Sequence, residues 1–290
     1  MNPSPINLRR PVHQLAGIVI PSPHSGRRYS QEFLAASRLN AETIRGSEDG
    51  FVDELLAMAP TLGLPLLSAE FPRAWCDVNR EPWELDPAMF ANPLPDYVNI
   101  TSPRVAVGLG TIARIVGTGE PIYARKLLFE EAKARIETCW RPFHEALAGL
   151  IEESLKAFGY CFVLDCHSMP TPVNRRGARP DIILGDGHGT SCYPAWTAHM
   201  EMVFKAQGLS VLRNDPYAGG YITRHYGCPN RDVQVMQIEI ARSLYMNERQ
   251  FTRKSSFEMM SHKMTNFMRQ MIMAIQSWGA IGPRFNEAAE

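Results

Sequence analysis

This 290-residue sequence has no net charge, because its 30 Lys and Arg residues balance its 30 Asp and Glu residues. A general nucleic-acid binder is clearly basic, so we expect no nucleic-acid partner. No apolar run approaches the ~20 residues that a membrane span needs, and residues 1–10 contain no apolar segment typical of a secretory signal. We therefore expect a cytoplasmic protein that has no membrane partner.

Cysteine is also sparse. The six cysteines are scattered along the chain and form no CxxC motif, which excludes a dense disulfide framework and a thiolate zinc site. One of them, Cys166, is followed by His167, so a Cys-dependent amidase is one alternative. Adjacent residues of a strand point to opposite faces, however, and a nucleophilic cysteine needs a base within hydrogen-bond reach. The pair therefore gives little support to that alternative.

Apolar patterns along the chain predict alternating strands and helices, which is typical of an α/β protein whose sheet lies between helix layers. We expect a single domain over residues 1–290, with a core at about 16–250. The expected strands are 16–20, 64–69, 160–164, 181–184, 210–213 and 233–240. The expected helices are 51–59, 123–157 with a break at Pro142, 193–207 and a C-terminal helix at 256–278, and we expect a long loop at 79–102 and a hairpin at 104–122.

Histidines follow two of the expected strands. His24 comes after the strand at 16–20, and His167 comes after the strand at 160–164. Ligands of open α/β sheets bind outside the carboxyl ends of the strands, so both imidazoles can reach one point. A catalytic zinc ion takes three His or carboxylate ligands, and the acidic pair Glu48-Asp49 could supply the third. These residues alone fit a metal site and structural, hydrogen-bonded histidines about equally well.

Five segments occur in an order and at a spacing that are together informative. They are PHSG (23–26), DVNR (77–80), LDCHS (164–168), GGYITRHYG (219–227) and QIEIARSLYM (237–246). With them the sequence resembles the N-formylglutamate amidohydrolase family. The resemblance implies a single catalytic domain with a mixed, mostly parallel sheet flanked by helices, of the zinc-exopeptidase or phosphorylase/hydrolase type. It also implies one zinc ion held by His24, Asp49 and His167, with Asp49 preferred to Glu48.

The resemblance also implies two catalytic residues, Glu239 and Arg73. Glu239 stands in an otherwise apolar strand, where a carboxylate is costly to bury unless it is paired or linked to a metal. The family reading makes it the base that deprotonates the attacking water, and the alternative is an internal ion pair with Arg224 or Arg242. Arg73 resembles the arginine that polarises the scissile carbonyl, and the alternative is a structural pair with an aspartate on its loop.

Substrate binding is expected from two further segments. A ligand with a free carboxylate needs a bidentate cation and an amide donor, which Arg80 and Asn79 supply. N-formylglutamate has a second carboxylate, for which Arg224 is the natural partner. Thr223 and His225 lie beside it as further candidate substrate contacts, and His225 could equally pack against the sheet.

The function implied by the resemblance is hydrolysis of N-formyl-L-glutamate to formate and glutamate, as in the last step of one bacterial route of histidine degradation. Two alternatives stay open at this point. One is a related deacylase that acts on another small N-acyl amino acid, because a family does not fix the pocket. The other is a non-catalytic module that binds an acidic ligand. Nitrogen and oxygen ligands also suit first-row metals other than zinc.

Overall fold

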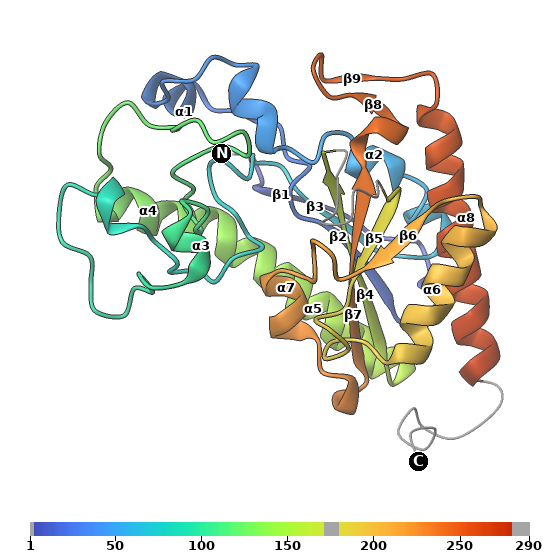
Figure 1. Ribbon diagram of the computed structural model, residues 1–290. Coiled ribbons are helices and arrows are strands. Elements are labelled where there is room, and N and C mark those ends of the chain that lie inside the picture. The colour runs from blue at the N-terminus through green and yellow to red at the C-terminus, as the bar shows by residue number, and fades with distance from the viewer. Residues whose placement is uncertain (1–2, 171–179, 280–290) are drawn as a thin grey trace. The chain divides into compact units, whose positions relative to one another are not determined.

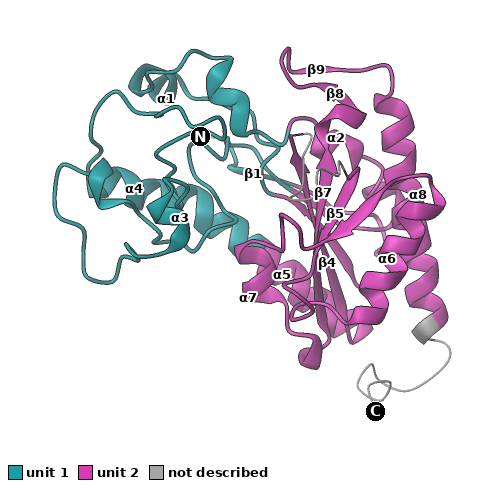
Figure 2. Ribbon diagram, in the orientation of Figure 1, with its two compact units in different colours: residues 1–7, 23–49, 68–146 teal, residues 8–22, 50–67, 147–290 magenta. Residues whose placement is uncertain are grey.

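The computed structural model describes residues 3–170 and 180–279, and these fall into two compact units (Figure 2). Unit 1 comprises residues 1–7, 23–49 and 68–146, and unit 2 comprises residues 8–22, 50–67 and 147–290. The chain crosses between the units several times, and this division does not test whether residues 1–290 fold as one domain. That expectation stays a prediction.

Seven strands of the described residues form one sheet in the order β1-β3-β2-β4-β7-β5-β6 (Figure 1). Strand β2 is parallel to β4, β4 to β7 and β5 to β6, while β5 is antiparallel to β7. The prediction of an α/β fold with a mixed, mostly parallel sheet flanked by helices is therefore confirmed. The strands are β1 (Ile6–Arg9), β2 (Ile18–Ser22), β3 (Leu66–Ala69), β4 (Cys161–Met169), β5 (Ile182–Gly185), β6 (Val211–Arg213) and β7 (Val233–Ala241).

The main hydrophobic core lies on one face of this sheet. Alternate residues of β4, namely Phe162, Leu164 and Cys166, enter this core together with side chains of α2 (Val52–Leu55), α6 (Pro194–Ala206) and α8 (Phe257–Gly279). Helices α6 and α8 contact each other on this side of the sheet (Figure 1). Burial of each large apolar side chain stabilises the fold by roughly 1.5–3 kcal/mol, so this layer fixes the position of the central strands.

On the opposite face of β4, the side chains change from apolar to polar along the strand. Cys161 and Val163 lie on it first, and Ser154 of α5 (Arg141–Phe158) hydrogen-bonds the Cys161 thiol. The next residues on that face are Asp165 and His167, which are equally buried but polar. The strand therefore continues through the residues that the sequence analysis placed after its end, and two of its side chains enter the candidate site from the sheet itself.

The predicted helix at 123–157 is two helices. α4 (Phe129–Arg135) is joined to α5 by a π-helical turn, η4 (Ile136–Trp140), which ends two residues before Pro142. A proline clashes with the carbonyl four residues earlier in a regular helix, and the wider turn relieves this contact. The helical start lies at 129 because the Glu131 carboxylate accepts a hydrogen bond from the backbone N–H of Leu128 over 2.8 Å.

The predicted hairpin at 104–122 is wrong. The segment begins as a short helix, α3 (Pro103–Ala106), because Ser102 Oγ accepts from the Val105 N–H over 3.1 Å and Pro103 suits the first helical turn. A single isolated bridge joins Ile115 to Pro121 within the segment. The helix expected at 51–59 is only α2, and the loop expected at 79–102 is interrupted by one short 3-10 turn, η3 (Pro87–Met89).

Several short elements escaped the sequence analysis. They carry too few residues for a periodic apolar pattern to show. The unpredicted elements are β1, α1 (Gln31–Ala36), η1 (Thr43–Ser47), η2 (Pro60–Leu62), α7 (Tyr221–Tyr226), η5 (Pro229–Arg231), η6 (Arg242–Leu244), β8 (Met246–Asn247) and β9 (Thr252–Arg253).

Among the helices of the described residues, none combines the length and the hydropathy that a membrane span needs.

Candidate active site

Two neighbouring parallel strands position the candidate metal ligands. His24 follows β2 by two residues, and His167 lies on β4. The turn after His24 requires Gly26, because a Cβ atom there would stand 2.1 Å from the carbonyl oxygen of Phe71. The Asp49 backbone N–H donates to the His24 carbonyl over 3.0 Å, which ties the acidic residue to the same turn.

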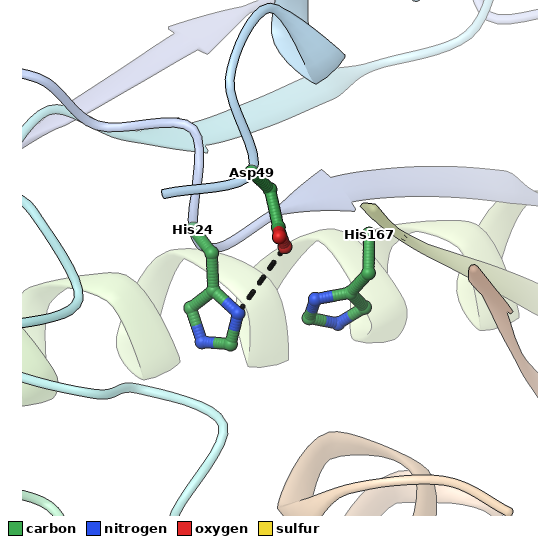
Figure 3. A group of neighbouring side chains, drawn as sticks. All are labelled: His24, Asp49 and His167. Atoms are coloured by element: carbon green, nitrogen blue, oxygen red, sulfur yellow. Dashed lines mark ion pairs between the residues drawn. The ribbon is translucent and has the colours of Figure 1, made fainter. Parts of the chain in front are cut away.

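His24, Asp49 and His167 come together as a possible metal site, and Figure 3 shows the three side chains converging. One ligand atom from each lies within 4.8 Å of the others. The Nδ1 atom of His24 is 3.4 Å from Oδ2 of Asp49, and the three residues are only 1%, 1% and 3% exposed. Ligands at ~2.0–2.1 Å from a tetrahedral ion are roughly 3.3 Å apart, so the two imidazoles and one carboxylate fit such an ion.

Each histidine has a carboxylate on its far ring nitrogen. The Nε2 atom of His24 lies 2.7 Å from Oδ1 of Asp77, and Nε2 of His167 lies 3.0 Å from Oδ2 of Asp165. A carboxylate that accepts the Nε2 proton holds the neutral imidazole in the tautomer whose Nδ1 lone pair can bind a cation. Both imidazoles are therefore held as metal ligands usually are.

The two adjacent acids, Glu48 and Asp49, have different partners. The Glu48 carboxylate accepts from Arg45 over 2.9 and 3.1 Å and from the Tyr29 hydroxyl over 2.8 Å. Burial and the neighbouring Glu48 carboxylate raise the pKa of Tyr29 above its ordinary value, so the phenol stays a donor. The Glu48 carboxylate is thus bonded to Arg45 and Tyr29, and Asp49 is the acidic residue that lies with His24 and His167.

Asp77 connects His24 to two arginines of the same unit. Its Oδ2 lies 2.7 Å from Nη2 of Arg73 and 3.8 Å from Nη2 of Arg80. Burial opposes ionisation of Asp77, but the charges of Arg73 and Arg80 and the hydrogen bond from His24 hold its pKa well below the usual range. The carboxylate is therefore an anion that orients a metal-ligand candidate and both arginines at once.

The segment 78–80 is anchored by the first residues of α5 and the turn before it. Trp140 Nε1 donates to the Arg80 carbonyl over 2.9 Å, and His144 Nε2 donates to the Val78 carbonyl over 2.8 Å. The Arg80 guanidinium donates from Nε to the Leu109 carbonyl and from Nη1 to the Asn79 carbonyl. Burial lowers the pKa of Arg80 to about 10, which still leaves it charged at neutral pH.

Glu239 lies next to His167 in the sheet. The parallel register pairs His167 with Glu239 and Asp165 with Gln237, so all four side chains share one face of the two strands. Gln237 Nε2 donates to Oε1 of Glu239 over 2.8 Å. The structure thus places the predicted base beside a predicted metal ligand.

Helix α7, which packs against β7, carries Thr223, Arg224 and His225. Arg224 is exposed and has no ion-pair partner among the described residues, so an ion pair between Arg224 and Glu239 is not formed. His225 stacks on Tyr221 at 4.8 Å, and partial burial lowers its pKa, which favours the neutral imidazole. Thr223 is fully buried and packs against Gly219, whose φ of +121° suits glycine. Substrate contacts by these residues stay predictions.

Cys166 does not have the environment of a nucleophile. Its thiol is 1% exposed and lies in the main hydrophobic core, on the face of β4 opposite His167. Burial raises the pKa of this thiol well above its ordinary value, so the reactive thiolate is disfavoured. The structure therefore argues against the Cys-dependent amidase.

Three polar residues support this site, and only Gln237 has no role suggested by the sequence, in which Asp77 could hold its loop or orient Arg80 and Asp165 could support the site or end its strand. Asp77 and Asp165 hold the imidazoles, and Gln237 holds Glu239. The same signal that points to Asp165 could have found Gln237, because each stands two residues before a functional candidate on a strand and so shares its face. No sequence signal links Asp77 to His24, because 53 residues separate the pair.

An α/β sheet with two histidines and a carboxylate gathered at neighbouring strands is the arrangement of a candidate metal-dependent hydrolase. A family model described as N-formylglutamate amidohydrolase matches residues 16–246. The chain belongs to this family of amidohydrolases. The predicted family is thus confirmed, and the predicted small-molecule amide substrate agrees with it at the level of the family.

Curated relatives and solved structures agree with this assignment. The chain is 29% identical over 269 residues to N-formylglutamate deformylase of Pseudomonas putida, covering 91% of this chain and 93% of that protein. The protein of the same name from Pseudomonas aeruginosa is 28% identical over 268 residues, with coverage of 90% and 93%.

Among solved structures, N-formylglutamate amidohydrolase from Ralstonia eutropha JMP134 superposes with a TM-score of 0.89 at 33% identity, covering 95% of this chain and 100% of that one. The gene product Atu2144 from Agrobacterium tumefaciens superposes with a TM-score of 0.63 at 17% identity, covering 94% and 97%, and shows a shared fold.

Proposed function

We propose that this protein hydrolyses the amide of N-formyl-L-glutamate to formate and glutamate, with one zinc ion held by His24, Asp49 and His167. The observation that carries the proposal is the buried group of two imidazoles and one carboxylate, each imidazole held by a second carboxylate. When bound there, a divalent ion would polarise the formyl carbonyl and lower the pKa of water. The names of the curated relatives support the substrate.

The proposed reaction uses Glu239 as general base. Glu239 takes a proton from the attacking water and returns it to the leaving nitrogen, so the carboxylate is regenerated in each cycle. Its place beside His167 in the register of β4 and β7 supports this role. Arg73 would direct its guanidinium to the carbonyl oxygen, where negative charge develops in the transition state.

The proposed substrate contacts divide the two carboxylates between two segments. Asn79 and Arg80 would bind one, and Arg224 the other, with Thr223 and His225 beside it. The network of Asp77 supports the first assignment, because the same carboxylate orients Arg80 and the metal-ligand candidate His24. The exposure of Arg224, without an ion pair among the described residues, supports the second.

A panel of N-acyl amino acids tests the proposal. Formate release should give a kcat/KM for N-formyl-L-glutamate at least ~10-fold above that for N-formyl-L-glutamine, which corresponds to ~1.4 kcal/mol. N-formyl-L-methionine and N-acetyl-L-glutamate complete the panel, and for the acetyl compound, which gives acetate, release of the free amino acid is measured. A higher kcat/KM for another acyl amino acid would identify a related deacylase instead. Binding of these acids without turnover by the zinc-loaded protein would identify a non-catalytic module.

A further inference from the structure

Strand β7 carries an unusual pair of polar side chains. Every residue of β7 is buried, yet Gln237 and Glu239 stand on it with exposures of only 5% and 7%. Gln237 Nε2 donates a hydrogen bond to Glu239 Oε1 over 2.8 Å. A buried carboxylate is costly unless polar partners replace the lost water, and the amide supplies one such partner within the same strand.

The pair has a defined place in the sheet. Gln237 is in register with Asp165 and Glu239 with His167 on parallel β4. On the other side of β7, antiparallel β5 places Gly185 beside Gln237, where an added Cβ would meet the backbone of Ala218 and Gly219 at 2.8 Å. The sheet position beside Gln237 is therefore closely packed, because Gly185 leaves room there for the backbone of Ala218 and Gly219.

The same relationship occurs on both strands. On β4 the residue two positions before His167, Asp165, holds that imidazole, and on β7 the residue two positions before Glu239, Gln237, holds that carboxylate. Residues two apart on a strand share a face and are stacked along it. An amide that is hydrogen-bonded to one oxygen of a carboxylate restricts rotation of that carboxylate, because hydrogen bonds have preferred distances and angles.

We propose that Gln237 is a positioning residue that sets the orientation of the Glu239 carboxylate for proton transfer. The inference rests on the proposed function, in which Glu239 is the general base. Proton transfer requires a donor and acceptor at hydrogen-bond distance in a fixed orientation, and a small misplacement can cost ~100-fold in rate. Gln237 acts through Glu239 and needs no contact with substrate.

A double-mutant cycle tests the proposal. Gln237→Met keeps the length of the side chain and removes the amide donor. We expect kcat for N-formyl-L-glutamate to fall ~10–100-fold with KM nearly unchanged. In a Glu239→Gln background the same change should alter the residual kcat by less than ~2-fold, because interacting residues are not additive. Bound metal and the melting temperature are measured for every variant.

The matched control is Gln234→Met. Gln234 is a buried glutamine of the same strand, but its Oε1 accepts from the Tyr193 N–H and it has no role in the proposed site. We expect a change in melting temperature without a specific loss of kcat. Should Gln237→Met fail to fold, Gln237→Asn carries the same test, because its shorter side chain places the amide too far from Glu239.

Two results would overturn the proposal. One is an equal fold-loss of kcat for Gln237→Met in the wild-type and Glu239→Gln backgrounds, which would indicate a structural role. The other is an unchanged kcat in well-folded Gln237→Met protein. Failure of the underlying function is recognised separately, because Glu239→Gln alone would then retain wild-type turnover, or the wild-type protein would release no formate.

Discussion

The Nε2 atom of His24 lies 2.7 Å from Oδ1 of Asp77, while the other oxygen of that carboxylate lies 2.7 Å from Nη2 of Arg73. A single buried anion thus links a candidate metal ligand to a candidate electrophilic arginine. Because burial disfavours a lone charge, Asp77 keeps its anionic form through these cationic and hydrogen-bonding partners. We therefore predict that metal binding by His24 and transition-state stabilisation by Arg73 both depend on the Asp77 carboxylate.

Replacement of Asp77 by Asn tests this link. The amide no longer provides the charge that holds the His24 proton and the Arg73 guanidinium, so zinc affinity should fall ~10–100-fold. Equilibrium dialysis against a competing chelator measures the affinity. Asp86→Asn is the control, because Asp86 pairs with Arg114 and with no histidine. Wild-type zinc affinity in a folded Asp77→Asn protein would show that the carboxylate does not support the metal site.

Removal of the proposed base should separate catalysis from metal binding. Glu239→Gln is nearly isosteric but cannot accept a proton, so turnover should fall by ~10²–10⁴ while the protein keeps its metal. Elemental analysis and formate release on the same sample give both quantities. Unchanged turnover would place the base elsewhere, and loss of the metal would make Glu239 a ligand.

The specificity prediction concerns Arg224. Arg224→Met keeps much of the bulk and removes the charge. A hydrogen bond to a charged group contributes about 1.5–3 kcal/mol, so the preference for N-formyl-L-glutamate over N-formyl-L-glutamine should fall by ~10–100-fold. Arg231→Met, which removes another exposed arginine shortly after α7, is the matched control. Equal losses on both substrates would contradict a role in reading the second carboxylate.

The pH dependence of stability should include a contribution from Glu131. Its hydrogen bond to Arg125, opposed by burial and assisted by the Leu128 N–H, lowers its pKa from 4.5 to about 2. A depressed folded-state pKa gives stability that is present above the unfolded value and is lost as pH falls toward the folded one. Because Glu131 is only partly buried and its partner Arg125 is exposed, solvent screens the pair and the contribution should be below ~1 kcal/mol.

The measurement is urea unfolding at several pH values. Wild type should be more stable than Glu131→Gln above pH 4.5, and the difference should disappear between pH 4.5 and about 2. Glu130→Gln, one residue away, should show no such change, because no ion pair or hydrogen bond of its side chain is formed among the described residues. A difference between wild type and Glu131→Gln that is independent of pH would refute the assignment.

The long buried strands were predictable from sequence because their pattern is dictated by burial alone. The apolar residues at 160–164 and the run at 233–240 both mark central strands, now β4 and β7. The continuation of β4 through Asp165 and His167 was not predictable, because polar residues in a strand look like its end. The short helix α3 depends on a cap at Ser102, which no apolar period reveals, so the sequence pattern predicts a hairpin there instead.

Sequence motifs identify the candidate ligands, but they do not show which of these residues come together in the folded protein. The family resemblance favours Asp49 over Glu48, but the residue types alone do not separate these adjacent acids. In the fold, Glu48 contacts Arg45 and Tyr29, and Asp49 lies with the histidines. Likewise, the role of Asp77 depends on a contact with His24 that the fold creates. Local pattern identifies which groups can do chemistry, and packing decides which of them meet.

The most direct test of the account is metal reconstitution. The protein is stripped with a chelator, dialysed and titrated with zinc, and formate release from N-formyl-L-glutamate is followed at each step. The account predicts no activity in the stripped protein, full activity at one zinc per chain, and no recovery in His167→Ala. Full activity of the stripped wild-type protein, or full recovery of His167→Ala at one zinc per chain, would contradict it.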